Sequence, residues 1–205
     1  MFVKICGITH PDDARIAASA GADAIGLNFV STSRRYVDTE RAKLILATIP
    51  SHVMTVGVFQ DQTTSEILAT TRSLALDAVQ VHGDTSTDYT AALVEEVATV
   101  IRVITVDGLA VPSVADSELA DIVMLDAAVS GSGIAFDWNL VGDLTTHHKV
   151  VLAGGLRPDN VSEAVATVQP WGVDVATGVE KPNGRKDPRA ITRFVAAARS
   201  SHAFG

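Results

Sequence analysis

The sequence predicts an α/β fold in which eight parallel strands close into a single-domain (β/α)8 barrel, a TIM barrel. Short apolar strands alternate with amphipathic helical stretches from one end of the chain to the other. The length of 205 residues, 47% of them hydrophobic, suits one domain with a sizeable core. Eight strand–helix units in so short a chain are most simply accommodated by closure. We expect the barrel to occupy residues 1–199 and residues 200–205 to form a frayed tail.

Strands are expected where short apolar runs are bounded by turn residues, and helices where the apolar positions recur every three or four residues. The predicted strands span residues 2–6, 23–29, 53–59, 77–82, 99–105, 121–125, 149–153 and 171–176. The predicted helices span residues 11–20, 39–48, 63–74, 87–97, 112–119, 138–145, 159–167 and 187–199.

Several helices carry clear start and stop signals. Pro11 precedes two acidic residues in a first turn, and Gly21 closes that helix. Thr63 and Glu66 have the spacing of a capping box. Asp159 and Asn160 follow Pro158 at the start of a later helix, and Asp187-Pro188 opens the last one. An open doubly wound sheet is the alternative fold, but it usually stops at five or six strands, and no Gly-x-Gly-x-x-Gly follows the first strand.

Composition excludes several classes of function. Sixteen basic and 24 acidic residues give a net charge of −8, which argues against a nucleic-acid surface. No run approaches the roughly 20 apolar residues of a membrane span, and the N-terminus does not resemble a signal peptide. With one cysteine there is no intramolecular disulfide. We therefore expect a cytoplasmic protein without nucleic-acid or membrane partners, in which an anionic substrate needs a local anion trap.

The single cysteine, Cys6, stands where a barrel would place its chemistry. Strand alternation puts Phe2, Lys4 and Cys6 on one face, and Gly7 then ends the strand. Cys6 thus lies at the carboxyl-terminal tip, where barrels of this kind carry their active sites. The plainer interpretation is a small buried hydrophobic residue.

Other polar residues follow the remaining strands and would share that rim. Taken singly, His82 suits a structural histidine, Arg35 a solvated loop, and Asp126 or Asp174 a turn cap. Their coincidence with Cys6 on one rim favours a catalytic site. Glycine-rich turns lie there too, and their backbone N–H groups can face phosphate oxygens unhindered by a Cβ atom. The candidate phosphate-binding residues are Gly131, Gly133, Gly154, Gly155, Thr177 and Gly178.

The ordered set of motifs resembles the phosphoribosylanthranilate isomerase family of tryptophan biosynthesis. The resemblance covers nearly the whole chain, and it rests on the set more than on any one motif. The matching segments are Lys4-Ile5-Cys6-Gly7, Ser33-Arg34-Arg35-Tyr36-Val37, Val56-Gly57-Val58-Phe59, Val79-Gln80-Val81-His82-Gly83, Leu125-Asp126, Gly131-Ser132-Gly133 through Phe136-Asp137-Trp138, Leu152-Ala153-Gly154-Gly155-Leu156, and Val173-Asp174-Val175 through Gly178-Val179-Glu180 and Lys186-Asp187.

The resemblance implies an isomerase that needs no cofactor or metal. The family converts N-(5′-phosphoribosyl)anthranilate into 1-(2-carboxyphenylamino)-1-deoxyribulose 5-phosphate by an Amadori rearrangement. By motif, Cys6 resembles the general base and Asp126 the general acid. Arg35 resembles the residue that pairs with the anthranilate carboxylate, and His82 and Asp174 resemble residues that line the anthranilate side. The substrate would be a phosphorylated aminosugar, and the protein a monomer or a homodimer.

Both catalytic roles require shifted pKa values. A free thiol has a pKa of about 8.5, so we expect Lys4, on the same strand face, to favour the thiolate. A carboxylic acid that donates a proton needs a raised pKa, which the apolar Val123 and Leu125 before Asp126 would promote.

The chain departs from the family pattern in three places. The loop between Asp126 and Phe136 is short and contains Ser130-Gly131-Ser132-Gly133, Ala176-Thr177-Gly178 stands where Ser-Ser-Gly is usual, and Ser31-Thr32 stands where a proline is common. None of these changes removes a proposed catalytic group.

Three alternative functions remain open from sequence. A histidine-pathway aminoaldose isomerase performs the same rearrangement, but related barrels carry a carboxylate where Cys6 stands. A Schiff-base aldolase would need a lysine in the barrel, and Lys4 is the candidate in a strand. An inactive phosphosugar-binding barrel fits the altered loops but not the intact pair of Cys6 and Asp126.

Overall fold

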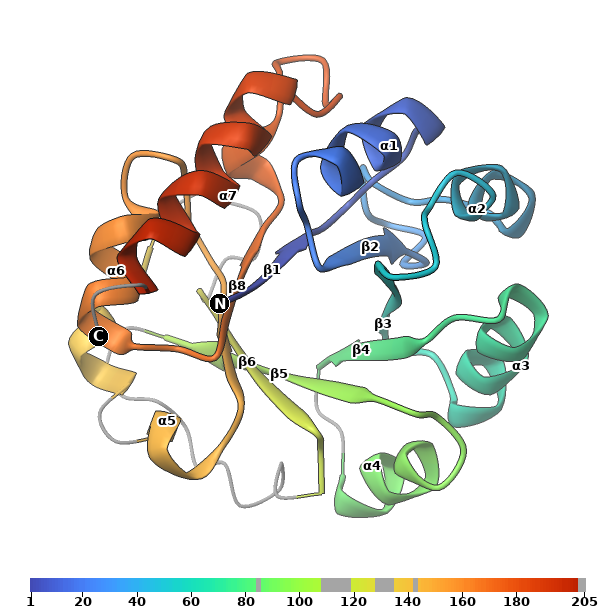
Figure 1. Cartoon of the computed structure of the whole chain (residues 1–205). Helices are drawn as coiled ribbons and strands as arrows, with labels where there is room; N and C mark the ends of the chain where they lie inside the picture. The colour runs from blue at the N-terminus through green and yellow to red at the C-terminus, as the bar shows by residue number, and fades with distance from the viewer. Residues whose placement is uncertain (84–85, 108–118, 128–134, 142–143, 203–205) are drawn as a thin grey trace.

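The computed structural model describes residues 1–83, 86–107, 119–127, 135–141 and 144–202 and shows a closed barrel of eight parallel strands with helices around it (Figure 1). Each strand pairs with its sequence neighbours, and β1 also pairs with β8, which closes the barrel. The predicted fold class is therefore confirmed. The strands are β1 Phe2–Ile5, β2 Ala24–Asn28, β3 Met54–Gln60, β4 Ala78–His82, β5 Val100–Val106, β6 Ile122–Ala127, β7 Val150–Leu152 and β8 Gly172–Val175.

Helices follow the strands along most of the described chain and lie around the barrel (Figure 1). The structure ends the last helix at His202, three residues beyond its predicted end, while residues 112–118 of a predicted helix lie outside the described part. The division into a barrel of residues 1–199 and a tail stays a prediction. The helices are α1 Pro11–Ser19, α2 Thr39–Leu46, α3 Thr64–Leu74, α4 Thr87–Val94, α5 Leu144–His147, α6 Val161–Val168 and α7 Pro188–His202, with short 3-10 turns η2 Trp138–Val141 and η3 Thr177–Val179.

The helix predicted over residues 138–145 is wrong. Its place is taken by η2 and by the four-residue α5. Asp137 starts η2, because its side chain accepts a hydrogen bond from the Asn139 N–H and its carbonyl accepts one from the Leu140 N–H. This three-residue spacing is that of a 3-10 turn. The apolar spacing in this segment indicated burial correctly but not a continuous helix.

The start and stop signals predicted at α1, α3 and α7 are confirmed, whereas Asn160 at the start of α6 makes no side-chain capping hydrogen bond. Thr63 and Glu66 form a reciprocal capping box at the start of α3. The Asp187 carboxylate accepts from the Arg189 N–H at the start of α7. Gly21, after α1, adopts a left-handed backbone with φ of 93°, which an L residue rarely adopts.

Two apolar layers hold the barrel together. The larger one fills the space between strands and helices, and Ile5, Leu27, Ile67 and Phe194 belong to it. The smaller one fills the inside of the barrel and includes Ala24, Val56, Ala78, Ile101, Ile122, Met124 and Val151. Strand alternation separates the two sets, because successive residues point to opposite faces.

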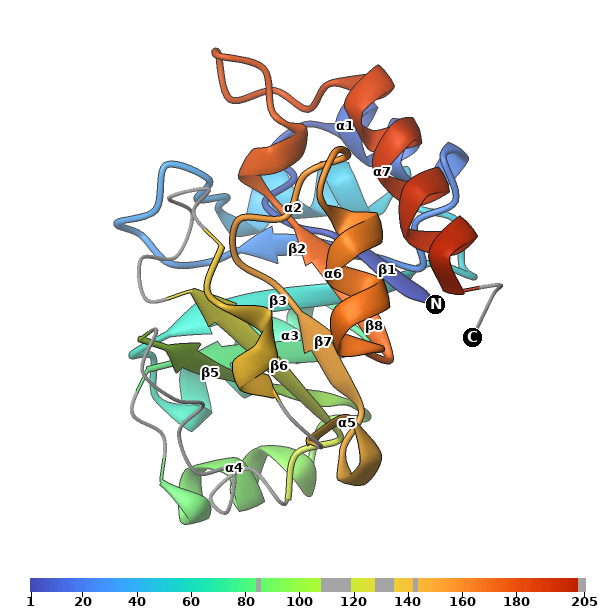
Figure 2. The same ribbon diagram turned by 90° about the vertical axis from the view of Figure 1, so that its left-hand side faces the viewer.

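The inside of the barrel changes from apolar to polar along the strands. On β3 the inward residues run from Met54 through Val56 and Val58 to Gln60, which pairs in register with His82 of β4. At the opposite end of the barrel, Gly172 of β8 leaves room for the side chain of Phe2. A Cβ atom at position 172 would collide with Phe2. In Figure 2 the strand tips face one side of the molecule and the two chain termini lie on the other. The polar tips therefore share one end of the barrel.

Replacing Phe194 with alanine tests the outer layer. Phe194 is fully buried on α7, which packs against α6 and α1. The cavity left behind should lower the free energy of unfolding by about 3–5 kcal/mol. Denaturant unfolding measures this, with Arg193→Ala on the exposed side of the same helix as the control, expected to change it by less than about 0.5 kcal/mol. Equal effects of the two substitutions would contradict the assignment of Phe194 to the core.

Candidate active site

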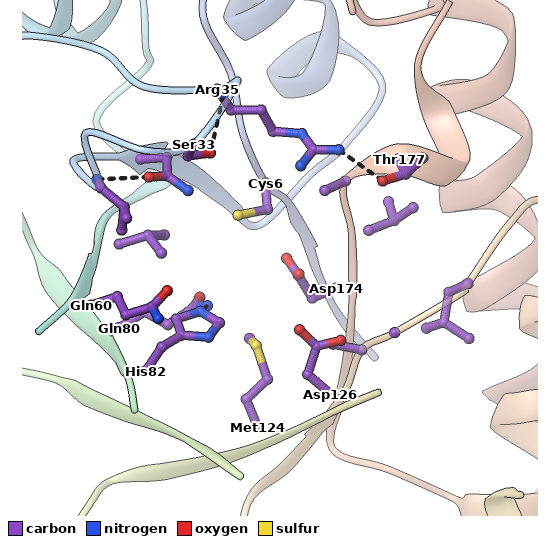
Figure 3. A pocket seen from close by; sticks show the side chains of 18 of the residues that line it. Cys6, Ser33, Arg35, Gln60, Gln80, His82, Met124, Asp126, Asp174 and Thr177 are labelled. Atoms are coloured by element: carbon purple, nitrogen blue, oxygen red, sulfur yellow. Dashed lines mark hydrogen bonds between the residues drawn. The ribbon is translucent and has the colours of Figure 1, made fainter. Parts of the chain in front are cut away.

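A cavity of about 240 Å³ opens at the carboxyl ends of the strands. Figure 3 shows Cys6, Asp174 and Asp126 along one side of it, His82 and Gln80 on the other, and Arg35 at its edge. The lining residues are Cys6, Asn28, Val30, Thr32, Ser33, Arg35, Val58, Gln60, Gln80, His82, Met124, Asp126, Ala153, Gly154, Gly155, Leu156, Asp174, Val175, Ala176, Thr177 and Gly178.

The structure brings together all the predicted site residues that it describes. Cys6, Arg35, His82, Asp126, Asp174, Gly154, Gly155, Thr177 and Gly178 all line this cavity. Gly131 and Gly133 lie outside the described residues.

Cys6 and Lys4 both face the space left by Gly26 of β2, which has no side chain. A Cβ atom on Gly26 of β2 would lie 2.8 Å from the Cys6 sulfur and 3.2 Å from the Lys4 Nζ. A side chain there would force one of them to move, so Gly26 allows the sulfur and the ammonium to face the same space. Lys4 is fully buried inside the barrel. A charged group with no access to water requires a partner.

That partner is Asp174 of β8. The Lys4 Nζ lies 2.9 Å from the Asp174 Oδ1, and the two residues are direct neighbours in the β1–β8 register. Burial works to lower the pKa of Lys4, but the charge of Asp174 and then that of Cys6 outweigh it, so its pKa lies above the ordinary value. Lys4 is thus held as an ammonium ion, which is not the neutral amine that a Schiff-base aldolase needs.

The Cys6 thiol is governed by burial more than by Lys4. Burial raises the pKa of Cys6 and outweighs the nearby charge of Lys4, which lowers it, and the charge of Asp174 raises it further. Lys186 adds a smaller lowering effect. The expectation that Lys4 favours the thiolate is correct in direction, but the net shift of the Cys6 pKa is upward.

Asp126 is the next-to-last residue of β6 and lies beside Asp174 in Figure 3. Its Oδ1 accepts a hydrogen bond of 2.8 Å from the Ala127 N–H, and little of the residue is exposed. Gly154 allows this packing, because a Cβ atom there would lie 2.8 Å from that oxygen and would also meet the Ala127 backbone. The backbone of Gly154 also has a φ of 75°, so both the close packing and the backbone conformation require glycine at this position.

His82 faces the cavity as a neutral imidazole. Burial, and then the charge of Lys4, lower the pKa of His82 from 6.5 to about 4. The His82 Nε2 lies 2.8 Å from the side-chain Nε2 of Gln80, two residues earlier on the same face of β4. At neutral pH the ring can therefore stack or hydrogen-bond with a ligand without carrying charge.

Arg35 is held at the cavity edge by the segment that follows β8. Its Nε lies 2.6 Å and its Nη2 lies 3.1 Å from the two carboxylate oxygens of Glu180, and Nη2 also donates to the Thr177 Oγ1 at 2.7 Å. The aliphatic part of Arg35 lies against Gly7, where a Cβ atom would collide with the Arg35 Cδ. These contacts fix the plane of the guanidinium at the edge of the cavity, on the side of Cys6 (Figure 3).

The glycine turns at β7 and β8 have the form of an anion site. Gly154 and Gly155 both adopt positive φ values, 75° and 68°. Gly178 lies so close to the Leu156 carbonyl that a Cβ atom would collide with it. These turns bring two stretches of backbone together at the cavity, where their N–H groups can face an anion.

Sequence reasoning missed several polar residues of the cavity. Asn28, Gln60 and Gln80 were not assigned a role, although each is an inward-facing polar residue near the end of its strand. That alternation was a usable signal. Glu180 and Lys186 were noted only as parts of motifs, and no local pattern shows that they contact Arg35 or each other.

Within the described residues, no cluster of three His, Cys, Asp or Glu side chains could hold a metal ion. Likewise, no described helix has the length and apolar character needed to cross a membrane.

Comparison with known proteins identifies close relatives. The profile of the family described as N-(5′-phosphoribosyl)anthranilate (PRA) isomerase matches residues 3–197. The isomerase of that name from Acidithiobacillus ferrooxidans is 42% identical over 97% of this chain and 98% of its own length. The one from Trichlorobacter lovleyi is 38% identical over the same shares.

Solved structures agree with this. The phosphoribosylanthranilate isomerase of Thermus thermophilus superposes with a TM-score of 0.90 at 35% identity, over 98% of this chain and 99% of that one. A second solved structure is that of a phosphoribosylanthranilate isomerase in complex with reduced 1-(o-carboxyphenylamino)-1-deoxyribulose 5-phosphate. It superposes with a TM-score of 0.84 at 34% identity, over 98% of this chain and 99% of that one.

Replacing Gly26 with alanine should crowd Cys6 and Lys4. We expect a loss of about 1–3 kcal/mol in the free energy of unfolding from overpacking. We also expect slower alkylation of Cys6 by iodoacetamide at a fixed pH, because separation from Lys4 removes an influence that lowers the thiol pKa. Since Cys6 is the only cysteine, the mass of the intact protein reports its reaction alone. Gly172→Ala, equally crowded against Phe2, is the matched control and should leave the alkylation rate unchanged.

The His82 ring should titrate with a midpoint of about 4 in a proton NMR titration, with His82→Gln to assign its signals. In the unfolded chain the ring titrates near 6.5. The unfolded state therefore binds the proton first, and stability falls as the pH drops from about 6.5 to 4. The substitution should remove this part of the pH dependence. A midpoint near 6.5 in the folded protein would show that water reaches the ring.

Proposed function

The chain belongs to the N-(5′-phosphoribosyl)anthranilate isomerase family, and from that premise we propose that its cavity performs the family's Amadori rearrangement with Cys6 as general base and Asp126 as general acid. The protein is an isomerase of tryptophan biosynthesis. The observation that carries the assignment of roles is the placement of a thiol and a carboxyl group, from β1 and β6, in one cavity.

The reaction needs two proton transfers at different atoms of the sugar. Asp126 donates a proton to the furanose ring oxygen as the bond from that oxygen to C1′ breaks, leaving a protonated Schiff base between C1′ and the aniline nitrogen. The Cys6 thiolate then removes the proton from C2′, and the electron pair moves to give an enolamine. Tautomerisation of the enolamine yields the aminoketose, with the C2′ oxygen as a ketone. A base and an acid in separate places suit these steps.

The surroundings of Cys6 support its role as a base. Burial raises its pKa, which makes the thiolate a stronger base once formed. Lys4 supplies the positive charge beside it, and Asp174 keeps that lysine charged. A base with a pKa near or above the working pH is effective, provided that a nearby cation keeps part of it ionised.

The two ends of the substrate have matching regions. Arg35 is proposed to bind the anthranilate carboxylate, since a planar guanidinium suits a planar carboxylate. His82, neutral at pH 7, and Asp174 are proposed to line the anthranilate side. The phosphate is proposed to bind the backbone around Gly154, Gly155, Thr177 and Gly178, together with Gly131 and Gly133, which lie outside the described residues.

The relatives do not favour the histidine-pathway substrate, since the matching proteins bear the name of the anthranilate isomerase. An inactive binding barrel would not need an acid and a base in one cavity. One similar solved structure shows monomers generated from the dimeric phosphoribosylanthranilate isomerase of Thermotoga maritima. We propose that this chain acts as a monomer or a homodimer in the cytoplasm, without metal or cofactor.

Turnover of freshly generated phosphoribosylanthranilate, followed by loss of its fluorescence, tests the proposal. Cys6→Ser and Asp126→Asn should each lower kcat about 10²–10⁴-fold, the usual contribution of a positioned acid or base. The exposed Asp12→Asn is the control and should leave kcat unchanged. Near-normal turnover in either cavity variant would refute the role assigned to that residue. No turnover by the unaltered protein above spontaneous hydrolysis would refute the activity itself.

A further inference from the structure

A row of three buried charges leads from the cavity edge into the segment after β8. The Arg35 guanidinium contacts both oxygens of Glu180, and the Glu180 Oε1 also lies 3.0 Å from the Lys186 Nζ. The side chains are 14%, 4% and 1% exposed, in the order Arg35, Glu180, Lys186. Neither Glu180 nor Lys186 is among the residues that line the cavity.

We propose that Glu180 and Lys186 are positioning residues for Arg35: Glu180 fixes the plane of the guanidinium, and Lys186 keeps the cluster positive enough to bind the substrate carboxylate. The inference rests on the proposed function, which gives Arg35 that carboxylate.

Orientation of Arg35 comes from three sides. Glu180 binds one edge of the guanidinium through two oxygens, a geometry that fixes its plane. Thr177, in the turn proposed for phosphate, accepts from the same Nη2 group. Gly7 supports the aliphatic part of the side chain. A guanidinium held in this way loses little conformational freedom when a carboxylate binds to it.

The charges explain why a lysine stands behind the glutamate. Arg35 and Glu180 alone would form a neutral pair with little attraction for an anion. Lys186 restores a net charge of +1 to the three residues, in a protein whose total charge is −8. Arg34 also contacts Glu180 at 2.7 Å, but most of its side chain is exposed, so solvent screens its charge.

Lys186 also has a second contact, which points to a link with the neighbouring turn. Its Nζ donates to the Ala176 carbonyl at 3.0 Å, directly before Thr177. The adjacent Arg185 instead binds Asp13 of α1 through two nitrogens. Two cations next to each other in the same segment thus have separate tasks, Arg185 toward the helix layer and Lys186 toward the cavity edge. This makes Arg185 a matched control.

Binding of two ligands separates positioning from general structural support. One probe is reduced 1-(o-carboxyphenylamino)-1-deoxyribulose 5-phosphate, and the other is the same compound without the carboxyl group. The ratio of their dissociation constants, measured by calorimetry, gives the preference of a protein for the carboxylate. The proteins compared are the unaltered chain, Lys186→Met, Glu180→Gln, the double variant carrying both changes, and Arg185→Met.

We expect Lys186→Met to lower the carboxylate preference roughly tenfold, the scale of one hydrogen bond to a charged group. Glu180→Gln should lower it as well, because the guanidinium is no longer fixed. The double variant should regain part of what Lys186→Met lost, since its cluster again carries a net charge of +1. In turnover, KM should rise in Glu180→Gln much more than kcat falls, whereas Lys186→Met also removes a charge that lowers the pKa of Cys6, so its kcat should fall as well. Arg185→Met should leave the preference unchanged.

Equal weakening of both ligands in the single variants would overturn the inference, because it would mean that the cluster acts through the fold as a whole. A double variant no better than Lys186→Met would overturn the role of net charge. The proposed function is tested separately by the unaltered chain: if it shows no preference for the carboxylated ligand, the role of Arg35 fails, whatever the variants do.

Discussion

The pairing of β1 with β8 is the constraint on which the rest of the structure depends. It closes the barrel and sets Lys4 beside Asp174, two residues 170 positions apart in the chain. A fully buried lysine is tolerated inside the barrel only because this carboxylate neutralises it. The same closure places Cys6 next to the pair, with its sulfur toward Gly26 of β2. Loss of the closure would leave a buried charge without its partner, so the ion pair ties the cavity to the fold.

An acidic protein binds an anionic substrate here by keeping its positive charges where water is scarce. The total charge is −8, yet Lys4, Arg35 and Lys186 all lie in or directly behind the cavity. Each has a carboxylate partner within 3.0 Å, either Asp174 or Glu180. The partners hold the cations in place and limit the cost of burying them. We expect the backbone N–H groups of the glycine turns to supply the remaining attraction for an anion without adding side-chain charge.

Much of the fold follows from local patterns. Short apolar runs bounded by turn residues located the strands to within a residue or two, because both faces of a barrel strand are buried. The capping box at Thr63 and the left-handed Gly21 needed only nearby residues to form. The helix predicted over residues 138–145 was based on the same kind of apolar spacing, but there the prediction was wrong. Its apolar spacing reflects burial, but the hydrogen bonds to Asp137 start a 3-10 turn over Trp138–Val141 in place of an α-helix.

The sequence by itself determined which side chains stand at the strand tips, because the two-residue period of a strand and the shared direction of parallel strands place Cys6, His82, Asp126 and Asp174 at one end. It also indicated where backbone turns need glycine. Only the tertiary structure decided which charges meet. Arg35 contacts Glu180 across 145 positions of chain, and Gly26 shapes the gap that Cys6 shares with Lys4. Such contacts depend on distances between separate strands and loops, which no local period encodes.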